Sequence, residues 1–287
     1  MTPRHAARRL LSMLALALAF TLVSANAHAT GRFTSLDFPD AQSTTASAIS
    51  TLGQIVGWYR VNGETRDHGF LLSFGRFTTI DPPGSQHTRA FGINLRGDIV
   101  GTYRTADGVD HGFLLRRGRY VTIDAPNAEG TAAFGINAGG DIVGTFDDGE
   151  EHGFLLSEGT FTTIEMPDAE ETPAANSING EGEIVGRIVS GTPEISKGFL
   201  LSGGEFTEIA VPGASFTTAF GLNGRGDVVG RYLLGGVTHG FLLSRGVFTN
   251  VDVPGAVFTS ARGINLWGAI VGEYRDAAGR VHGFVKH

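Results

Sequence analysis

The sequence of 287 residues contains no cysteine, no excess of basic residues and no long amphipathic helical pattern. The absence of cysteine excludes disulfide bonds, so stability has to come from buried area, which a chain of this length can supply in one domain. The formal net charge of −7 argues against binding to nucleic acid or to anionic membrane surfaces, because both need basic patches. The 43 glycines and the many Phe, Thr, Ile and Val residues instead favour short strands and tight turns.

Motifs for catalysis are absent as well. The sequence has no His/Cys cluster, no nucleophile elbow and no phosphate loop, and Gly224–Gly230 lacks the spacing of the dinucleotide fingerprint. The acidic segment Asp147–Glu151 could hold calcium, but it does not match the EF-hand pattern, and a solvated loop is the commoner outcome. We therefore assign no catalytic residue, no cofactor and no metal site from the sequence.

Residues 1–29 have the pattern of a secretory signal peptide. Three arginines form a basic head, Leu10–Val23 is an apolar run too short for a comfortable membrane span, and Ala27–Ala29 is a small-x-small cleavage site. Cleavage removes three arginines and no acid, so the net charge becomes −10. The sequence predicts a mature chain of residues 30–287 that is soluble in the periplasm or outside the cell and does not insert into a membrane.

One unit is repeated six times along the mature chain. An element of the form Phe-Thr-x-Ile-Asp begins at Phe33, Phe77, Tyr120, Phe161, Phe206 and Phe248. Each copy continues with segments like Ala90–Asn94, Asp98–Tyr103 and His111–Leu115, which makes four short β segments per 41–45 residues. Four strands at this period are typical of a propeller blade. The sequence therefore predicts an all-β fold, a six-bladed β-propeller with four antiparallel strands per blade, in a single domain.

The two ends of the repeat array predict that the ring is closed. The array opens with the outer-strand element Phe33–Asp37 and stops just after His282–Lys286, so the last copy lacks one strand. Pairing these two segments would complete the sixth blade and leave no open sheet edge. An open solenoid would instead need distinctive end caps, and none is visible.

The hairpins between the third and fourth strands predict which residues face each other. Each has glycine at the second central position, which is typical of a two-residue turn. Counting outward from this turn predicts the pairs His68–Asp81, His111–Asp124, His152–Glu165, His239–Asp252 and, across the closed ring, His282–Asp37. In the fourth copy Lys197 and Ala210 replace both partners. Histidines on different blades cannot converge on one metal ion, so we interpret them as structural pairs contributing about 0.2–1 kcal/mol each.

Loop length varies on one face of the predicted ring only. This face carries the connections between blades and the loops between second and third strands, such as Val61–Asp67, Thr105–Asp110 and Val189–Ser196. Variable loops over a rigid scaffold are where binding residues usually lie. The position before the repeated threonine should ring the channel mouth on this face, and polar residues replace the inner-strand phenylalanine in some blades. The candidate ligand-binding residues are His87, Arg89, Glu170, Glu171, Asn176, Phe216, Phe258 and Arg262. Drift among decayed repeats is the alternative explanation.

The recurring Phe-Thr-x-Ile-Asp-x-Pro-Gly, Gly-Ile-Asn-x-x-Gly-Asp-Ile-Val-Gly-x-Tyr and His-Gly-Phe-Leu-Leu elements resemble the HAF family of bacterial extracellular repeat proteins. The resemblance covers essentially all of the mature chain and departs most in the fourth copy. It implies secretion and a repeat-built β fold. It implies no reaction and no catalytic residue.

These observations predict a secreted, monomeric, non-enzymatic binding module that holds a glycan, a peptide or a partner protein over the channel mouth. Such a module should expose aromatic side chains such as Phe216 and Phe258 without a paired acid and base. An extracellular propeller enzyme of the lyase or hydrolase type is the first alternative, and it needs two or three titratable groups within hydrogen-bond reach. The second alternative is a structural envelope protein without a small ligand.

Overall fold

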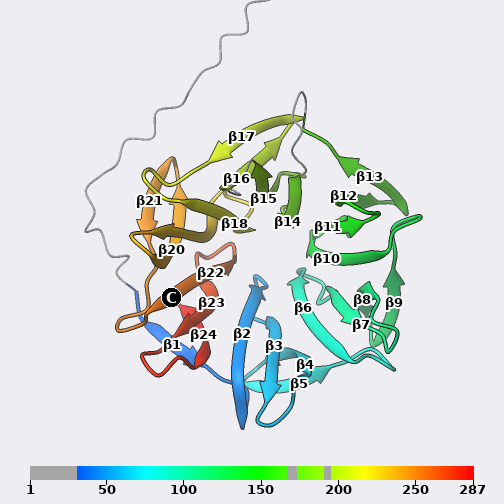
Figure 1. Cartoon of the computed structure of the whole chain (residues 1–287), viewed down its shortest axis with the longest axis horizontal. Helices are drawn as coiled ribbons and strands as arrows, with labels where there is room; N and C mark the ends of the chain where they lie inside the picture. The colour runs from blue at the N-terminus through cyan, green and yellow to red at the C-terminus, as the bar shows by residue number, and fades with distance from the viewer. Residues whose placement is uncertain (1–30, 167–172, 191–194) are drawn as a thin grey trace, which may run out of the picture.

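The computed structural model describes residues 31–166, 173–190 and 195–287. The predicted signal peptide, residues 1–29, and the candidates Glu170 and Glu171 lie outside the described residues. The described chain forms six four-stranded antiparallel sheets, which surround a central channel as the blades of a propeller (Figure 1). The predicted all-β, six-bladed architecture is confirmed. No helix in the described part of the chain is long and apolar enough to cross a membrane.

The strands of each blade follow the chain from the channel outward, except in the sixth blade. The first three blades contain β2 (Ala41–Ile49), β3 (Ile55–Val61), β4 (Asp67–Ser73) and β5 (Arg76–Ile80); β6 (His87–Ile93), β7 (Ile99–Arg104), β8 (Asp110–Arg116) and β9 (Arg119–Ile123); and β10 (Gly130–Ile136), β11 (Ile142–Asp147), β12 (Glu151–Ser157) and β13 (Thr160–Ile164). The other three contain β14 (Pro173–Ile178), β15 (Ile184–Ser190), β16 (Ile195–Ser202) and β17 (Glu205–Ile209); β18 (Phe216–Leu222), β19 (Val228–Leu234), β20 (Val237–Ser244) and β21 (Val247–Asn250); and β22 (Phe258–Ile264), β23 (Ile270–Arg275), β24 (Val281–Lys286) and β1 (Phe33–Leu36).

The ring closes through the first strand of the chain. Strand β1 pairs antiparallel with β24, with Phe33 opposite Lys286 and Leu36 opposite Gly283. The pairing extends beyond the strands, because the His287 amide donates a hydrogen bond to the Arg32 carbonyl at 3.3 Å. The predicted completion of the sixth blade is therefore confirmed, and it leaves no blade with a missing outer strand.

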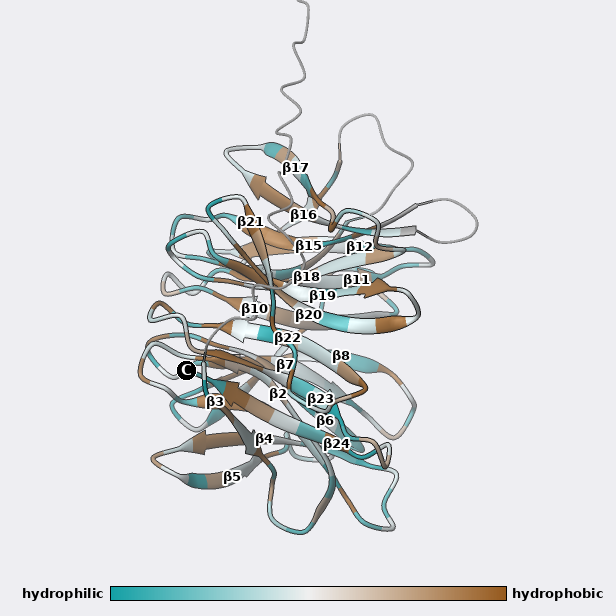
Figure 2. Ribbon diagram, turned by 90° about the vertical axis from the view of Figure 1, so that its left-hand side faces the viewer, coloured by the Kyte–Doolittle hydropathy of each residue, from teal (hydrophilic) through white to brown (hydrophobic). Residues whose placement is uncertain are grey.

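Each blade is held together by one phenylalanine of its third strand. These six side chains are the largest fully buried ones in the described chain: Phe70, Phe113, Phe154, Phe199, Phe241 and Phe284. Each ring lies against a glycine of the second strand. A Cβ atom on Gly101 would lie 2.6 Å from the ring of Phe113 and 2.1 Å from the backbone oxygen of Arg89. The repeated glycine thus makes room for the ring. Hydrophobic residues lie along the strands, while hydrophilic residues gather in the loops (Figure 2).

The predicted hairpin turns are present. In the first blade Ser73 pairs with Arg76, and the two residues between them, Phe74 and Gly75, have φ angles of 49° and 75°. Positive φ at both central residues is typical of a type I′ turn, whose twist matches that of the flanking strands. This turn places residue 68 opposite residue 81 and so sets the register that the sequence predicted for the histidines.

Asparagines at the ends of the inner strands connect neighbouring blades. The Oδ1 atom of Asn94 accepts hydrogen bonds from its own turn, and its Nδ2 atom donates to the carbonyl of Asn137 in the next blade at 3.1 Å. The same bridge runs from Asn223 to Asn265 at 3.1 Å and from Asn265 to Ser50 at 3.3 Å. These asparagines thus hold the blades together at one end of the channel.

Candidate functional site

Four of the five predicted histidine–carboxylate pairs are in hydrogen-bond contact. The Nδ1 atoms of His68, His111, His239 and His282 lie 2.7, 3.0, 2.9 and 3.0 Å from carboxylate oxygens of Asp81, Asp124, Asp252 and Asp37. The exception is His152. Its Nε2 atom bonds Asp148 at 3.1 Å, because this acid lies four residues earlier in the loop leading into the same strand. The side chain of His152 is therefore engaged away from the predicted partner, Glu165.

An aromatic ring of the second strand lies against each of these histidines, which sequence analysis missed. Tyr103 stacks on His111 with ring centres 5.3 Å apart, and its hydroxyl shares a 3.0 Å hydrogen bond with Thr122 of the outer strand. The tyrosine of the repeated Ile-Val-Gly-x-Tyr element was the available signal. Strand pairing places Tyr103 directly opposite His111. The described residues contain no group of three His, Asp or Glu side chains arranged to hold a metal ion.

The acidic segment Asp147–Glu151 is occupied by internal contacts. Asp147 accepts a hydrogen bond from the Gly149 amide at 2.9 Å, and Asp148 bonds His152. Glu151 forms an ion pair with Arg187 of the next blade at 2.7 Å. The three carboxylates therefore contact three different partners.

Two of the sequence candidates, His87 and Arg89, contact Asp67, a buried acid that sequence analysis missed. Arg89 binds Asp67 of the preceding blade at 2.5 Å, and the Asp67 amide donates to Nδ1 of His87 at 3.3 Å. Arg60 binds the second oxygen of Asp67 at 2.5 Å, and Asp67 is only 2% exposed. The available signal was an acid before the repeated histidine. The contact joins the first and second blades, and the single charge of Asp67 serves both arginines.

The candidate Arg262 also has a dedicated counter-charge. Its guanidinium binds Glu273 of the neighbouring strand at 2.7 Å, and Thr45 of the next blade donates to the same carboxylate at 2.8 Å. Burial of Glu273 alone would raise its pKa. The charge of Arg262 and the two hydrogen bonds outweigh burial and hold the pKa below its ordinary value. The pair is therefore ionised at neutral pH.

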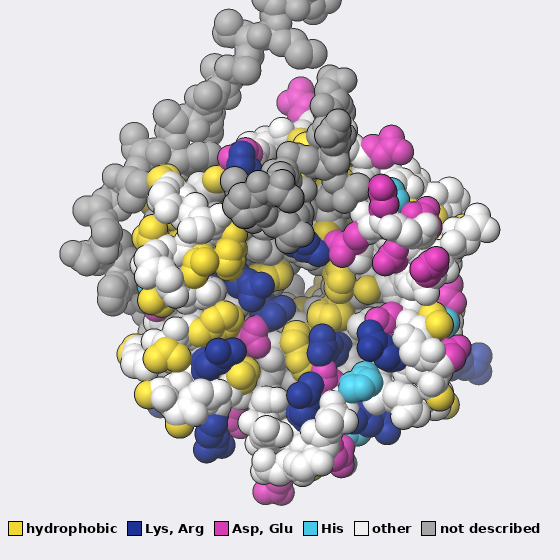
Figure 3. Space-filling model, in the orientation of Figure 1, with side chains coloured by type: hydrophobic (Ala, Val, Ile, Leu, Met, Phe, Trp, Pro, Cys, Tyr) yellow, Lys and Arg dark blue, Asp and Glu magenta, His cyan; other side chains and the backbone are white. Residues whose placement is uncertain are grey.

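Aromatic rings and guanidinium groups alternate around the channel on four consecutive blades. Arg231 lies over Phe216 and Phe220, Arg262 over Phe220 and Trp58, and Arg89 over Trp58, with distances of 5.0–5.7 Å from each guanidinium carbon to the ring centre. We call this set the arginine–aromatic arc: Phe216, Arg231, Phe220, Arg262, Trp58 and Arg89. One face of the molecule shows Lys and Arg side chains beside hydrophobic ones around its central hollow (Figure 3).

Arg231 differs from the other two arginines of the arc. Within the described residues no hydrogen bond or ion pair involves its guanidinium, and its Nε atom is buried without a partner. The position was not among the sequence candidates, although the variation at this site, which holds Trp, Thr, Arg or Glu, was a signal. Burial, reinforced by the like charge of Arg262, lowers the pKa of Arg231. Within the described residues Arg231 is thus the arginine of the arc without an ion pair, although the charge of Glu273 opposes a part of the lowering.

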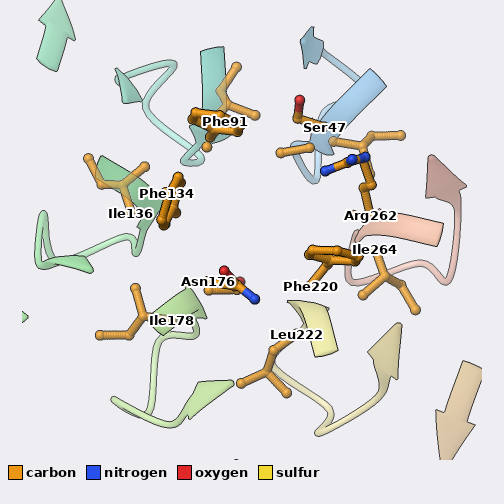
Figure 4. Close-up of a pocket in the computed structure, with 18 residues that line it drawn as sticks. Ser47, Phe91, Phe134, Ile136, Asn176, Ile178, Phe220, Leu222, Arg262 and Ile264 are labelled. Atoms are coloured by element: carbon orange, nitrogen blue, oxygen red, sulfur yellow. The ribbon is translucent and has the colours of Figure 1, made fainter. Parts of the chain in front are cut away.

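The remaining candidates lie apart from one another. Asn176 lines the channel, and its amide donates to the Ala219 carbonyl of the next blade at 2.8 Å (Figure 4). Phe216 is half-buried under Arg231 and Phe258 is half-buried under Arg275. The expectation that these two rings are exposed is therefore wrong, because an arginine of the adjacent strand covers each of them.

The fourth blade also corrects a detail of the repeat alignment. Strand pairing places Pro173 opposite Ile188, whereas in the second blade the repeated threonine, Thr88, lies opposite Tyr103. Pro173 therefore holds the threonine position in this blade. The sequence alignment had placed Glu171 immediately before that position.

At the level of the inner phenylalanines the channel is narrow. It is lined by the side chains of Ser47, Phe91, Phe134, Asn176, Phe220 and Arg262, with glycine, alanine, serine and aliphatic residues next to them (Figure 4). Its volume of about 100 Å³ has room for a few water molecules or a small group. A polymer would consequently lie across the mouth and would not thread through the ring.

Comparisons with known proteins bear on the fold. No family model matches the chain, and a search of curated proteins finds no match. Among solved structures, the Aleuria aurantia lectin in complex with a fucose-containing disaccharide is 12% identical, with a TM-score of 0.51 over 85% of this chain and 91% of the lectin. TolB from Acinetobacter baumannii is 12% identical, with a TM-score of 0.53 over 86% of this chain and 64% of TolB. The acylaminoacyl peptidase of Pyrococcus horikoshii is 12% identical, with a TM-score of 0.50 over 87% of this chain and 53% of the peptidase.

These matches place the chain among the β-propellers, a class that includes binding proteins and enzymes. At such low identity the likeness concerns the fold alone, and function has to be argued from the site.

Proposed function

We propose that this chain is a secreted binding module that holds a glycan across the channel mouth, on the arginine–aromatic arc. The carrying observation is the alternation of three rings with three guanidinium groups around one side of the channel. Apolar faces of sugar rings pack on aromatic side chains, and sugar hydroxyls accept hydrogen bonds from guanidinium N–H groups. The propeller lectin of Aleuria aurantia, solved with a bound disaccharide, supports this proposal by analogy.

The contacts of the acids at the mouth favour binding over hydrolysis. A general acid or base has to lie within hydrogen-bond reach of a substrate proton. Asp67 is 2% exposed and held by two arginines, and Glu273 is held by Arg262 and Thr45. Both carboxylates serve to position guanidinium groups. Secretion through residues 1–29 and membership of the HAF family are part of the proposal, and the mass of the exported chain would test cleavage after Ala29.

The two tryptophans of the chain allow a matched test of the proposal. Trp58 belongs to the arc, whereas Trp267 is 73% exposed in the β22–β23 turn at the other end of an inner strand. Binding of the mature chain to a panel of neutral and acidic oligosaccharides would be measured by calorimetry. We expect Trp58→Ala to weaken binding about tenfold or more, since loss of one stacked ring costs roughly 1–2 kcal/mol, and Trp267→Ala to leave it unchanged.

Thermal unfolding of both variants would establish that they are folded. Failure of the whole panel to bind, or equal loss of binding in both variants, would remove the arc as a glycan site.

A further inference from the structure

We infer that the glycan held on the arc carries a carboxylate, as uronic acids do, and that Arg231 binds it. This inference rests on the proposed function and adds the charge of the ligand to it. Three observations support it. The guanidinium of Arg231 has no ion pair within the described residues, it lies beside two aromatic rings, and the other arginines of the arc are bound to carboxylates.

The charges along the arc do not balance. Arg262 is neutralised by Glu273 at 2.7 Å, whereas Arg89 shares the single charge of Asp67 with Arg60, each at 2.5 Å. Arg231 has no hydrogen bond or ion pair within the described residues. The arc together with Arg60 therefore presents net positive charge in a chain whose formal net charge is −7. An isolated positive site in an acidic protein selects for a ligand group of opposite charge.

The surroundings of Arg231 make this cation costly to leave unpaired. Its Nε atom is buried without a partner, and a buried donor without a hydrogen bond destabilises the folded chain. Contacts with the faces of Phe216 and Phe220, at 5.7 and 5.4 Å, offset a part of this cost only. An incoming anion would supply the missing acceptor atoms.

Two hydroxyl groups near Arg231 and Arg262 are buried without a hydrogen-bond partner. In the next blade Ser260 has the strand position from which Thr45 reaches Glu273, one blade further on. The Ser260 hydroxyl is buried without a hydrogen bond, and so is the hydroxyl of Ser47 at the channel wall. Figure 4 shows Ser47 beside Arg262 and Phe220 around the channel. The arc thus has unused hydroxyl groups on both sides of Arg262.

The chemistry of the guanidinium favours a carboxylate. Its planar set of N–H donors matches the two oxygens of a carboxylate, which carries one negative charge. The flanking rings at the same time offer apolar surface to the sugar that bears the carboxylate.

The test compares oligogalacturonate with the same oligosaccharide after methyl esterification, which removes the charge and keeps the sugar ring. We expect the mature chain to bind the acid, to bind the ester about 10–100-fold more weakly, and to lose the same factor in Arg231→Leu. Arg231→Lys keeps the charge without the planar fork and should lose less. Binding of the acid should also weaken with added salt.

Arg275→Leu is the matched control. This residue lies over Phe258 at 5.5 Å, is exposed and stands one blade away from Arg231 outside the arc. The variant removes the same charge and should bind the acid like the parent. If it loses binding to the same extent as Arg231→Leu, the effect is one of net charge, and the assignment to Arg231 is overturned.

Three outcomes distinguish the inference from the proposed function. Equal binding of the acid and the ester, unaffected by Arg231→Leu, leaves the glycan site standing and removes the carboxylate. Tighter binding of a sulfated oligosaccharide of the same length, lost in Arg231→Leu, keeps the anion site and overturns the choice of carboxylate. If neither the acid, the ester nor any other member of the glycan panel binds, the proposed function fails and the inference fails with it.

Discussion

Two sets of polar residues lie at different distances from the propeller axis, and they differ in regularity. In the outer set a histidine bonds a carboxylate of the fourth strand and stacks on a ring of the second strand, with nearly constant distances in four blades. In the inner set, at the channel mouth, the residue after the second-strand glycine is of four types in the six blades: Trp58, Thr102, Thr145, Arg187, Arg231 and Glu273.

The difference distinguishes contacts that stabilise each blade from side chains that act together around the channel mouth. The histidine–carboxylate contact lies within a single blade and is repeated in four of them. It stabilises the pairing of the outer strand with the third strand. Several of the side chains that change around the ring have partners on neighbouring blades, so they have to be considered together. Arg89 with Asp67 and Thr45 with Glu273 are both contacts between blades. The experiments that follow test this division, beginning with the largest expected effect.

Removing the charge of Glu273 should have the largest effect. Glu273→Gln leaves Arg262 without a counter-charge beside Arg231, so we expect a loss of about 3 kcal/mol in the free energy of unfolding at neutral pH. Arg262 and Thr45 hold the pKa of Glu273 below its ordinary value despite burial. Its stabilising contribution is therefore present above the ordinary carboxyl pKa and is lost as the pH falls through the lowered folded value. Urea unfolding at several pH values would show the deficit shrinking in acid.

Glu208→Gln is the control for that measurement. Glu208 binds Lys197 at 2.8 Å on the outside of the fourth blade, and both side chains are exposed. Such a pair contributes about 0–1 kcal/mol. If the two variants lost the same stability, the inner ion pair would have no special weight, and the comparison between the sets would fail.

Lys286 departs from the repeat at a position of the third strand. Five blades have leucine there: Leu72, Leu115, Leu156, Leu201 and Leu243. Lys286 is only 7% exposed, and burial lowers its pKa. Lys286→Leu should therefore raise the free energy of unfolding by about 1 kcal/mol.

The lowered pKa of Lys286 determines how the stability difference between the parent and the variant changes with pH. A lowered folded pKa means that the parent gains stability as the pH rises from that value towards the ordinary lysine pKa. The advantage of Lys286→Leu should therefore be present at neutral pH and shrink in alkali. Lys197→Leu, the same change at the other lysine of the chain, removes an exposed side chain and should show no such trend. An unchanged or lowered stability of Lys286→Leu would mean that the irregular residue has a role of its own.

The regular features could be predicted because their causes are local. The two-residue turn after Ser73 sets the register of His68 and Asp81, and the same turn recurs along the chain. Closure followed from counting strands, since Phe33–Leu36 is the outer strand that the last copy lacks. The His152–Glu165 contact was mispredicted, because strand pairing fixes the position of a side chain but not the hydrogen bonds that it forms, and His152 bonds Asp148.

The inner set could be predicted only in part, because its contacts depend on how neighbouring blades are placed. The sequence singled out Arg89 and Arg262 as departures from the repeat, but it could not supply their partners. Asp67 lies 22 residues before Arg89 in the preceding blade. That Arg231 has no ion pair within the described residues is likewise a property of the packed ring. Departures from a repeat thus indicate candidate site residues, and the packing of the blades determines which partners those residues contact.

The smallest expected effect concerns a single outer pair. Asp124→Ala removes the carboxylate that His111 contacts at 3.0 Å and should lower the free energy of unfolding by about 0.2–1 kcal/mol. Glu165→Ala is the matched change in the third blade, where the histidine bonds Asp148 instead, and it should have no measurable effect. Because the expected difference is small, both variants would be compared with the parent in one urea titration series. A loss above 2 kcal/mol in Asp124→Ala, or equal losses in both variants, would show that the outer set is more than a strand fastener, and the division drawn between the two sets would have to be abandoned.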